Sequence, residues 1–144
     1  MQINYNDGGR EIAGYKGSAG DCVVRAIAIA TEQDYQKVYD KLFELNRNSK
    51  LKRDRLMSNH SPRDGGTSTK TIRKYMESLG WKWTPTMLIG KGCKVHLRED
   101  ELPKGRIIAR VSKHLTAVID GVINDTYDCS RDGTRCVYGF YSKN

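Results

Sequence analysis

The sequence predicts a single α+β domain over residues 1–144, with helices in the first half and antiparallel strands in the second. Three observations predict this order. Apolar residues recur at helical spacing in three segments before Gly80, and after Gly80 they alternate with polar residues, as in half-buried strands. Two of the later segments are joined by Asp120-Gly121, the dipeptide that tight type I′ hairpins prefer.

The chain is expected to begin with an irregular arm that leads into a central helix. Residues 1–20 are rich in glycine, with one short strand expected at 2–5. The stretch DCVVRAIAIA, residues 21–30, predicts a helix that starts at Asp21 or Cys22. This helix is apolar on nearly all sides, which is typical of a buried helix. Asp21 is expected to cap it.

Caps and apolar spacing predict two further helices. Residues 31–34 resemble a capping box with Asp34 in place of glutamate, and Thr67 or Ser68 is expected to cap the third helix before Gly80 ends it. The apolar positions are Tyr35, Val38, Tyr39, Leu42 and Leu45 in the second helix, and Ile72, Tyr75, Met76 and Leu79 in the third. Residues 46–66 between them predict a long basic loop, with a turn of helix near 51–57.

The strands are expected at 81–88 (interrupted at Pro85), 106–111, 114–120, 122–127 and 136–141, with a turn at 99–103. The hairpin at Asp120-Gly121 places Thr116 opposite Asp125. Residues two apart on one strand share a face, so His114 and Asp125 are diagonal neighbours on the same face of the sheet. A carboxylate there can orient the imidazole and stabilise its charged form.

Two other polar residues of this hairpin and two other histidines compete with that pair. Asn124 and Asp128 are expected on the opposite face of the hairpin from His114. His60 and His96 have no acid at a defined geometry, and we interpret both as structural or exposed to solvent.

Cys22 stands at the expected start of the central helix. Backbone N–H groups lack partners there, and their dipoles favour a thiolate. The alternative is a small core cysteine, because free cysteine is among the most buried residue types. Taken together with His114 and Asp125, Cys22 is better explained as a nucleophile whose proton is taken by an oriented imidazole.

The segments GDCVVRAIAIAT and HLTAVIDGVINDTYD resemble the papain-like cysteine peptidase superfamily, especially the small peptidase domains that process double-glycine leader peptides. They are also similar to small uncharacterised proteins of phages and bacteria. The resemblance implies a papain-like fold, with the cysteine-bearing helix packed on an antiparallel sheet. It implies Cys22 as nucleophile, His114 as general base and Asp125 as orienting residue. The implied reaction is hydrolysis of a peptide or isopeptide carbonyl through an acyl-thioester, without a metal or organic cofactor.

One position departs from the family pattern. Papain-like enzymes usually place a glutamine six residues before the cysteine as an oxyanion donor, and this chain has Lys16 there. The oxyanion would instead be held by the Cys22 amide with Lys16 or Ser18. An amidase, deamidase or acyltransferase with the same triad, and a binding module that has lost catalysis, remain alternative interpretations.

The net charge is +8, and residues 46–74 contribute most of it, with nine basic residues against two acidic ones. Such a segment attracts an acidic peptide or protein substrate or, in the binding alternative, a host protein or nucleic acid. The alternative is a solvated loop and helix face in a basic protein, which the absence of any aromatic residue in the segment before Tyr75 favours. The candidate binding residues are Arg47, Lys50, Lys52, Arg53, Arg55, Trp81 and Trp83, the two tryptophans being core or groove-wall residues.

The remaining features predict a cytoplasmic protein, in the host cytoplasm if a phage encodes it. No secretory signal is visible at the N-terminus, and the longest apolar run, 23–30, is too short to span a membrane. No metal site is expected, because Cys22, Cys93, Cys129 and Cys136 form no CxxC pair. Their thiols are expected to be reduced; a Cys129–Cys136 disulfide fits the separation but not the compartment.

Overall fold

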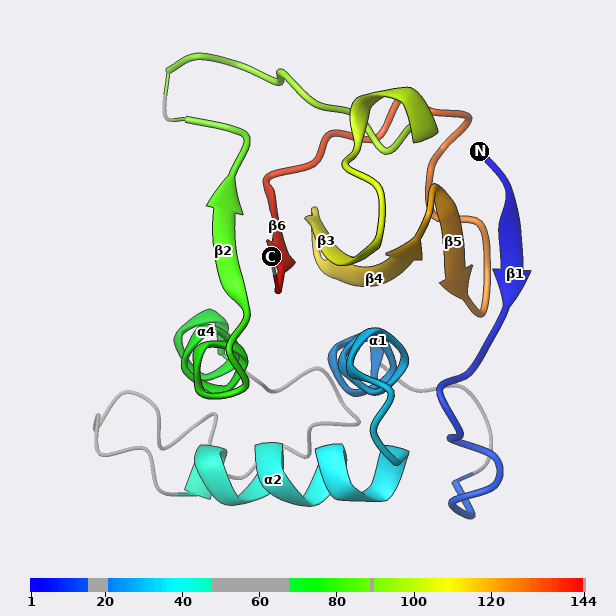
Figure 1. The fold of residues 1–144 in the computed structure, drawn as a ribbon, viewed down its shortest axis with the longest axis vertical. Coiled ribbons are helices and arrows are strands. Elements are labelled where there is room, and N and C mark those ends of the chain that lie inside the picture. The colour runs from blue at the N-terminus through cyan, green and yellow to red at the C-terminus, as the bar shows by residue number, and fades with distance from the viewer. Residues whose placement is uncertain (16–20, 48–67, 89, 144) are drawn as a thin grey trace.

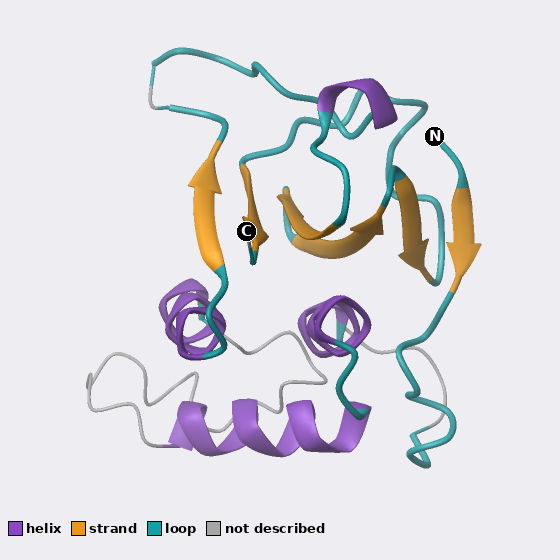
Figure 2. Cartoon of the chain, in the orientation of Figure 1, coloured by secondary structure: helices purple, strands orange, loops and turns teal. Residues whose placement is uncertain are grey.

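The computed structural model describes residues 1–15, 21–47, 68–88 and 90–143. Within them, three α-helices pack on a six-stranded mixed sheet, so the α+β class is confirmed. Figures 1 and 2 show the arrangement: α1 lies against the middle of the sheet, α4 lies beside the β2 edge, and α2 covers both helices from outside. The expected turn at 99–103 contains a short 3₁₀ helix, Glu99–Glu101.

Helix α1 (Cys22–Thr31) is the buried central helix that its composition predicts. Its residues 23–30 are all buried, and they include Arg25. Helix α2 (Tyr35–Arg47) follows after a short turn. Its cap is Asp34, whose carboxylate accepts the Lys37 amide at 3.3 Å. Thr31 does not start α2 as a capping box would require, because its hydroxyl donates to the Ile27 carbonyl at 2.6 Å and so closes α1.

Helix α4 (Thr69–Ser78) has the bounds and cap that the sequence predicts. Ser68 accepts the Thr71 amide at 3.2 Å, and Ile72, Tyr75 and Met76 are buried. The helix ends before Gly80, which has a φ of +86°. Most of the basic loop, together with the turn expected at 51–57, lies outside the described residues.

The strands are β1 (Ile3–Tyr5), β2 (Lys82–Pro85), β3 (Arg106–Val111), β4 (His114–Ile119), β5 (Val122–Asp125) and β6 (Gly139–Ser142), in the order β1-β5-β4-β3-β6-β2. The strands of the second half pair antiparallel, as predicted, but the sheet as a whole is mixed, because the N-terminal strand β1 runs parallel to β5 at its edge. The last strand begins at Gly139 rather than Cys136, because Cys136 instead forms an isolated bridge with His96.

The β4–β5 hairpin has the predicted register. Asp120 and Gly121 have φ values of 48° and 81°, as a type I′ turn requires. Val118 pairs with Ile123 and Ile119 with Val122, so continuing the ladder places Thr116 opposite Asp125. The side chains of β4 and β5 that matter for the site are therefore placed by a turn that the sequence specifies.

Apolar side chains pack on both faces of the sheet. On one face, α1, α2 and α4 enclose a cluster that includes Val24, Leu42 and Met76. On the other, the long connections around Leu97 and Val137 cover a smaller cluster. Burial on both faces explains why the central strands β3 and β4 are almost continuously apolar.

Two of the four cysteines form a disulfide, which corrects the expectation of reduced thiols throughout. Cys93 and Cys136 are joined, with their Cα atoms 5.9 Å apart, whereas Cys129 is a free and buried thiol. Spacing along the chain allows a bond between Cys129 and Cys136, but the structure does not form it. The correct partner is 43 positions away, and the pairing of His96 with Cys136 brings the two segments together.

No helix in the described part of the chain is long and apolar enough to cross a membrane.

Candidate active site

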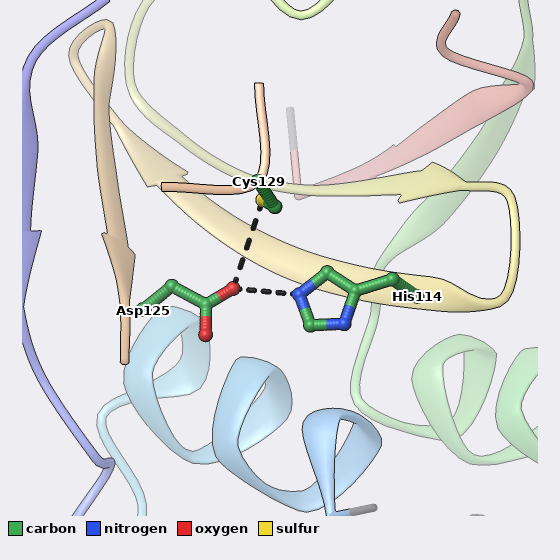
Figure 3. A group of neighbouring side chains, drawn as sticks. All are labelled: His114, Asp125 and Cys129. Atoms are coloured by element: carbon green, nitrogen blue, oxygen red, sulfur yellow. Dashed lines mark hydrogen bonds and ion pairs between the residues drawn. The ribbon is translucent and has the colours of Figure 1, made fainter. Parts of the chain in front are cut away.

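The three residues expected to form a triad come from three elements that meet at one end of the sheet. Cys22 opens α1, His114 opens β4 and Asp125 closes β5. His114 Nε2 lies 2.7 Å from Asp125 Oδ2, which confirms the predicted diagonal relation on one face of the hairpin. Figure 3 shows the His114 ring and the Cys129 sulfur both directed toward the Asp125 carboxylate.

Cys22 completes the group from the helix side. Its half-buried thiol lies close enough to the His114 side chain and to the backbone of Leu115 for both to lower the pKa of the thiol. Because Nε2 of the ring is engaged by Asp125, Nδ1 is the nitrogen left for the thiol. With Nε2 held by the carboxylate, the ring can exchange a proton with a thiol through Nδ1.

Asp125 is held from several directions. Its Oδ2 accepts the Thr116 hydroxyl at 2.8 Å, and its Oδ1 accepts the Thr126 amide at 2.7 Å. The Cys129 thiol lies 3.8 Å from Oδ2. With a side chain only 3% exposed, the carboxylate is a buried and fully partnered acceptor that cannot easily rotate away from His114.

A buried ion-pair network continues from Asp125 into helix α1. Arg25 Nη2 lies 3.4 Å from Asp125 Oδ1, while Arg25 Nη1 pairs with Asp21 Oδ1. Asp21 Oδ2 accepts the Tyr35 hydroxyl at 2.7 Å and lies 3.2 Å from Arg10 Nε. The expectation that the Asp21 side chain caps α1 is wrong: it makes no capping hydrogen bond, because these partners draw it away from the helix amides.

These contacts shift the pKa values of all three triad residues toward an ion pair. Burial opposes the thiolate, but the hydrogen bond and charge of His114, the Leu115 backbone and the charge of Arg25 lower the pKa of Cys22 overall. Burial also opposes the imidazolium, yet hydrogen bonds with Asp125, Cys129 and Cys22 raise the pKa of His114 to about 12. For Asp125, burial is outweighed by His114, Thr116 and the Thr126 amide, so its pKa is lowered.

The predicted oxyanion and binding residues are distributed differently. Seven residues named from the sequence lie outside the described part of the chain: Lys16, Ser18, Lys50, Lys52, Arg53, Arg55 and His60. Of Arg47, only the backbone is described, at the end of α2. Trp81 is 6% exposed and belongs to the core beside the helices. Trp83 packs at a tilt against Tyr141 and lies under Arg73. It belongs to the edge strand farthest from β5 in the sheet order, so neither tryptophan joins the triad.

The competing polar residues have partners other than His114. Asp128 accepts the amide and hydroxyl of Ser130, and the Asn124 side chain pairs with Asn4. His96 pairs with Glu101 at 3.2 Å on a partly exposed surface. None of these side chains contacts His114 among the described residues.

Four residues of the site were not singled out from the sequence. Thr116 follows directly from the hairpin register, and Arg25 was visible as the one charge inside an apolar helix. Tyr127 is half exposed, and the centroid of its ring lies 5.3 Å from that of the His114 ring. Nothing in the sequence marks Cys129 as part of the site, because only the turn after β5 brings it back to the Asp125 carboxylate.

The donor atoms of His114, Asp125 and Cys129 lie within 4.8 Å of one another, which is the spacing of metal ligands. His114 and Asp125 are hydrogen-bonded directly to each other, however, and the third potential ligand is the buried thiol of Cys129. This geometry is that of a hydrogen-bonded dyad with a neighbouring thiol, and the expectation that no metal is required stays a prediction.

The chain matches no protein-family model, no curated protein and no solved structure.

Proposed function

We propose that this protein is a papain-like thiol hydrolase that cleaves a peptide or isopeptide bond through an acyl-thioester on Cys22. The observation that best supports this proposal is the 2.7 Å contact between His114 Nε2 and the buried Asp125 carboxylate. This contact leaves Nδ1 of the same ring for the thiol. A histidine that merely filled space in the core would not need a carboxylate with all its acceptor positions occupied on one side and a free thiol on the other.

The reaction follows from that arrangement. The Cys22 thiolate attacks the carbonyl carbon, and the electron pair of the C=O bond moves to oxygen. When the tetrahedral intermediate collapses, the C–N bond breaks and the leaving nitrogen takes the proton from His114 Nδ1. Water then attacks the thioester and gives a proton to the ring, which releases the carboxylic acid and restores the thiolate–imidazolium pair.

The backbone supplies one donor for the developing oxyanion. Cys22 is the first residue of α1, where the helix offers no carbonyl to its N–H, and the helix dipole favours negative charge at that point. The second donor is proposed to come from Lys16 or Ser18, the residues that precede the helix.

The test uses 4-nitrophenyl acetate, which acylates activated thiols without requiring a particular peptide sequence. We expect a burst of nitrophenol and an acetyl group on Cys22, located by peptide mass spectrometry. Cys22→Ser should abolish the burst and His114→Gln should reduce it by about 10²-fold or more. The matched control is His96→Gln, which removes another histidine bonded to a carboxylate and should leave the burst unchanged.

An equal rate of acetylation in wild type and His114→Gln would contradict the proposal. Cys22 would then be an ordinary thiol, and a binding role would be the better explanation of the fold.

A further inference from the structure

We propose that Arg25 is a positioning residue that ties the triad acid Asp125 to the same helix that carries the nucleophile. The inference rests on the proposed function and adds a residue to it. Arg25 is the only charged residue within α1, and its side chain is 9% exposed. Burying a guanidinium is costly unless carboxylates compensate it, so its partners show what it holds.

Both partners of Arg25 are buried carboxylates. Nη1 pairs with Asp21 and Nη2 with Asp125 Oδ1, and the side chains of these acids are 0% and 3% exposed. The planar guanidinium presents its donors in a fixed fork, so it can bridge two acids in one geometry. A single ammonium lacks that fork.

The contact with Asp125 constrains how its two oxygens divide their partners. Arg25 and the Thr126 amide engage Oδ1, whereas His114 and Thr116 engage Oδ2. With Oδ1 held from the helix side, rotation of the carboxylate away from the imidazole would break an ion pair. Arg25 therefore acts on the ring through the acid.

The ion pair between Arg25 and Asp125 also affects how α1 packs against the hairpin. Cys22 and Arg25 are three residues apart, on neighbouring turns of one rigid element. Arg25 holds the end of β5, while Cys22 meets the start of β4. The ion pair thus sets how the helix sits against the hairpin, and with it the approach of sulfur to the ring.

The charges in this region balance only when Arg25 is present. Arg10, Arg25 and the imidazolium of His114 face Asp21, Asp125 and the thiolate of Cys22. Without Arg25, one buried negative charge is left uncompensated beside the thiolate. The charge of Arg25 is also one of the causes that lower the pKa of Cys22.

The experiment compares Arg25→Met and Arg25→Lys with the wild type. Lysine keeps the charge but loses the fork. The first readout is the rate of Cys22 alkylation by iodoacetamide at pH 6. The second is the NMR signal of the proton on His114 Nε2, which reports the bond to Asp125 directly. The control is Arg106→Met, because Arg106 contacts the far end of α1 at the Ile29 carbonyl and touches no triad residue in the described structure.

We expect both Arg25 variants to alkylate more slowly at pH 6, by up to about tenfold for each unit by which the thiol pKa rises. We also expect both to shift or broaden the His114 proton signal, while Arg106→Met changes neither readout. If Arg25→Met does not fold, Arg25→Lys decides. A folded Arg25→Lys variant with the wild-type alkylation rate and the wild-type His114 proton signal would overturn the proposal, since the charge alone would then be enough to position Asp125.

The two proposals fail in different ways. An absent acetyl burst in the wild type contradicts the thiol hydrolase. The His114 proton signal measures the histidine–aspartate bond whether or not the protein acylates. Arg25 variants that keep the wild-type signal therefore overturn the positioning role independently of the catalytic result.

Discussion

Asp125 shows how much of this site depends on one carboxylate. The hairpin brings His114 and Thr116 to its Oδ2, its own turn brings the Thr126 amide to Oδ1, and Arg25 reaches it from the helix. A buried acid with these partners stays ionised, and an ionised acid keeps the neighbouring imidazole protonated.

Asp125→Asn should therefore lower the pKa of His114 from about 12 toward the ordinary value for histidine, because the strongest partner of the charged ring is lost. The measurement is the pH dependence of the ¹⁵N shifts of the His114 ring. Asp128→Asn is the matched control, since this exposed acid three positions later bonds Ser130 and not the ring. A His114 that titrates alike in Asp125→Asn and wild type would contradict the account.

The residue scale also shows which contacts a sequence can predict. The His114–Asp125 pair follows from a two-residue turn and the two-residue period of a strand, both of which are local. The role of Arg25 is not local, because its partner Asp125 lies 100 positions away. The charge inside an apolar helix indicated that a partner must exist, but the sequence alone contains nothing that names the partner.

At the scale of elements, periodicity predicts the helices and the central strands well, and their edges less well. The expected strand 106–111 is observed unchanged as β3. The last strand starts three residues late, because the 136–138 segment pairs instead with the connection that carries Val95 and His96. The parallel pairing of β1 was not predicted, because nothing local in residues 2–5 specifies which edge they join.

The packing of β2 on β6 requires a glycine at 139. A Cβ atom there would lie 2.4 Å from the Trp83 ring and 2.8 Å from the Thr84 carbonyl. Trp83 thus packs directly on a neighbouring strand, which favours a structural role for it over the groove-wall interpretation.

Gly139→Ala should lower the free energy of unfolding by about 1–3 kcal/mol, the usual cost of overpacking. Part of this cost should disappear in a Trp83→Leu background, because the smaller side chain leaves room for the methyl group. Urea denaturation of the four proteins of this cycle measures the coupling. Full additivity would show that Trp83 does not press on residue 139.

At the scale of the whole molecule, three elements distant in sequence meet at one end of a mixed sheet. The helix places the Cys22 thiol in its first turn, and the hairpin places His114 against the Asp125 carboxylate. The Cys93–Cys136 disulfide joins two connections elsewhere and involves no triad residue. Composition could not predict that bond, because the pairing depends on which loops the sheet topology brings together.

We propose that Cys22 and His114 form a thiolate–imidazolium pair that Asp125 stabilises. The direct measurement is the rate of Cys22 alkylation by iodoacetamide as a function of pH. Because the folded protein lowers the pKa of Cys22, the thiolate persists below the ordinary titration range and is lost only as the pH falls through the lowered value. Alkylation should therefore stay fast at pH 6 in the wild type. In His114→Gln the midpoint should move to higher pH, because the partner that favours the thiolate is gone. Identical midpoints near the ordinary pKa of cysteine in both proteins would show that no such pair exists.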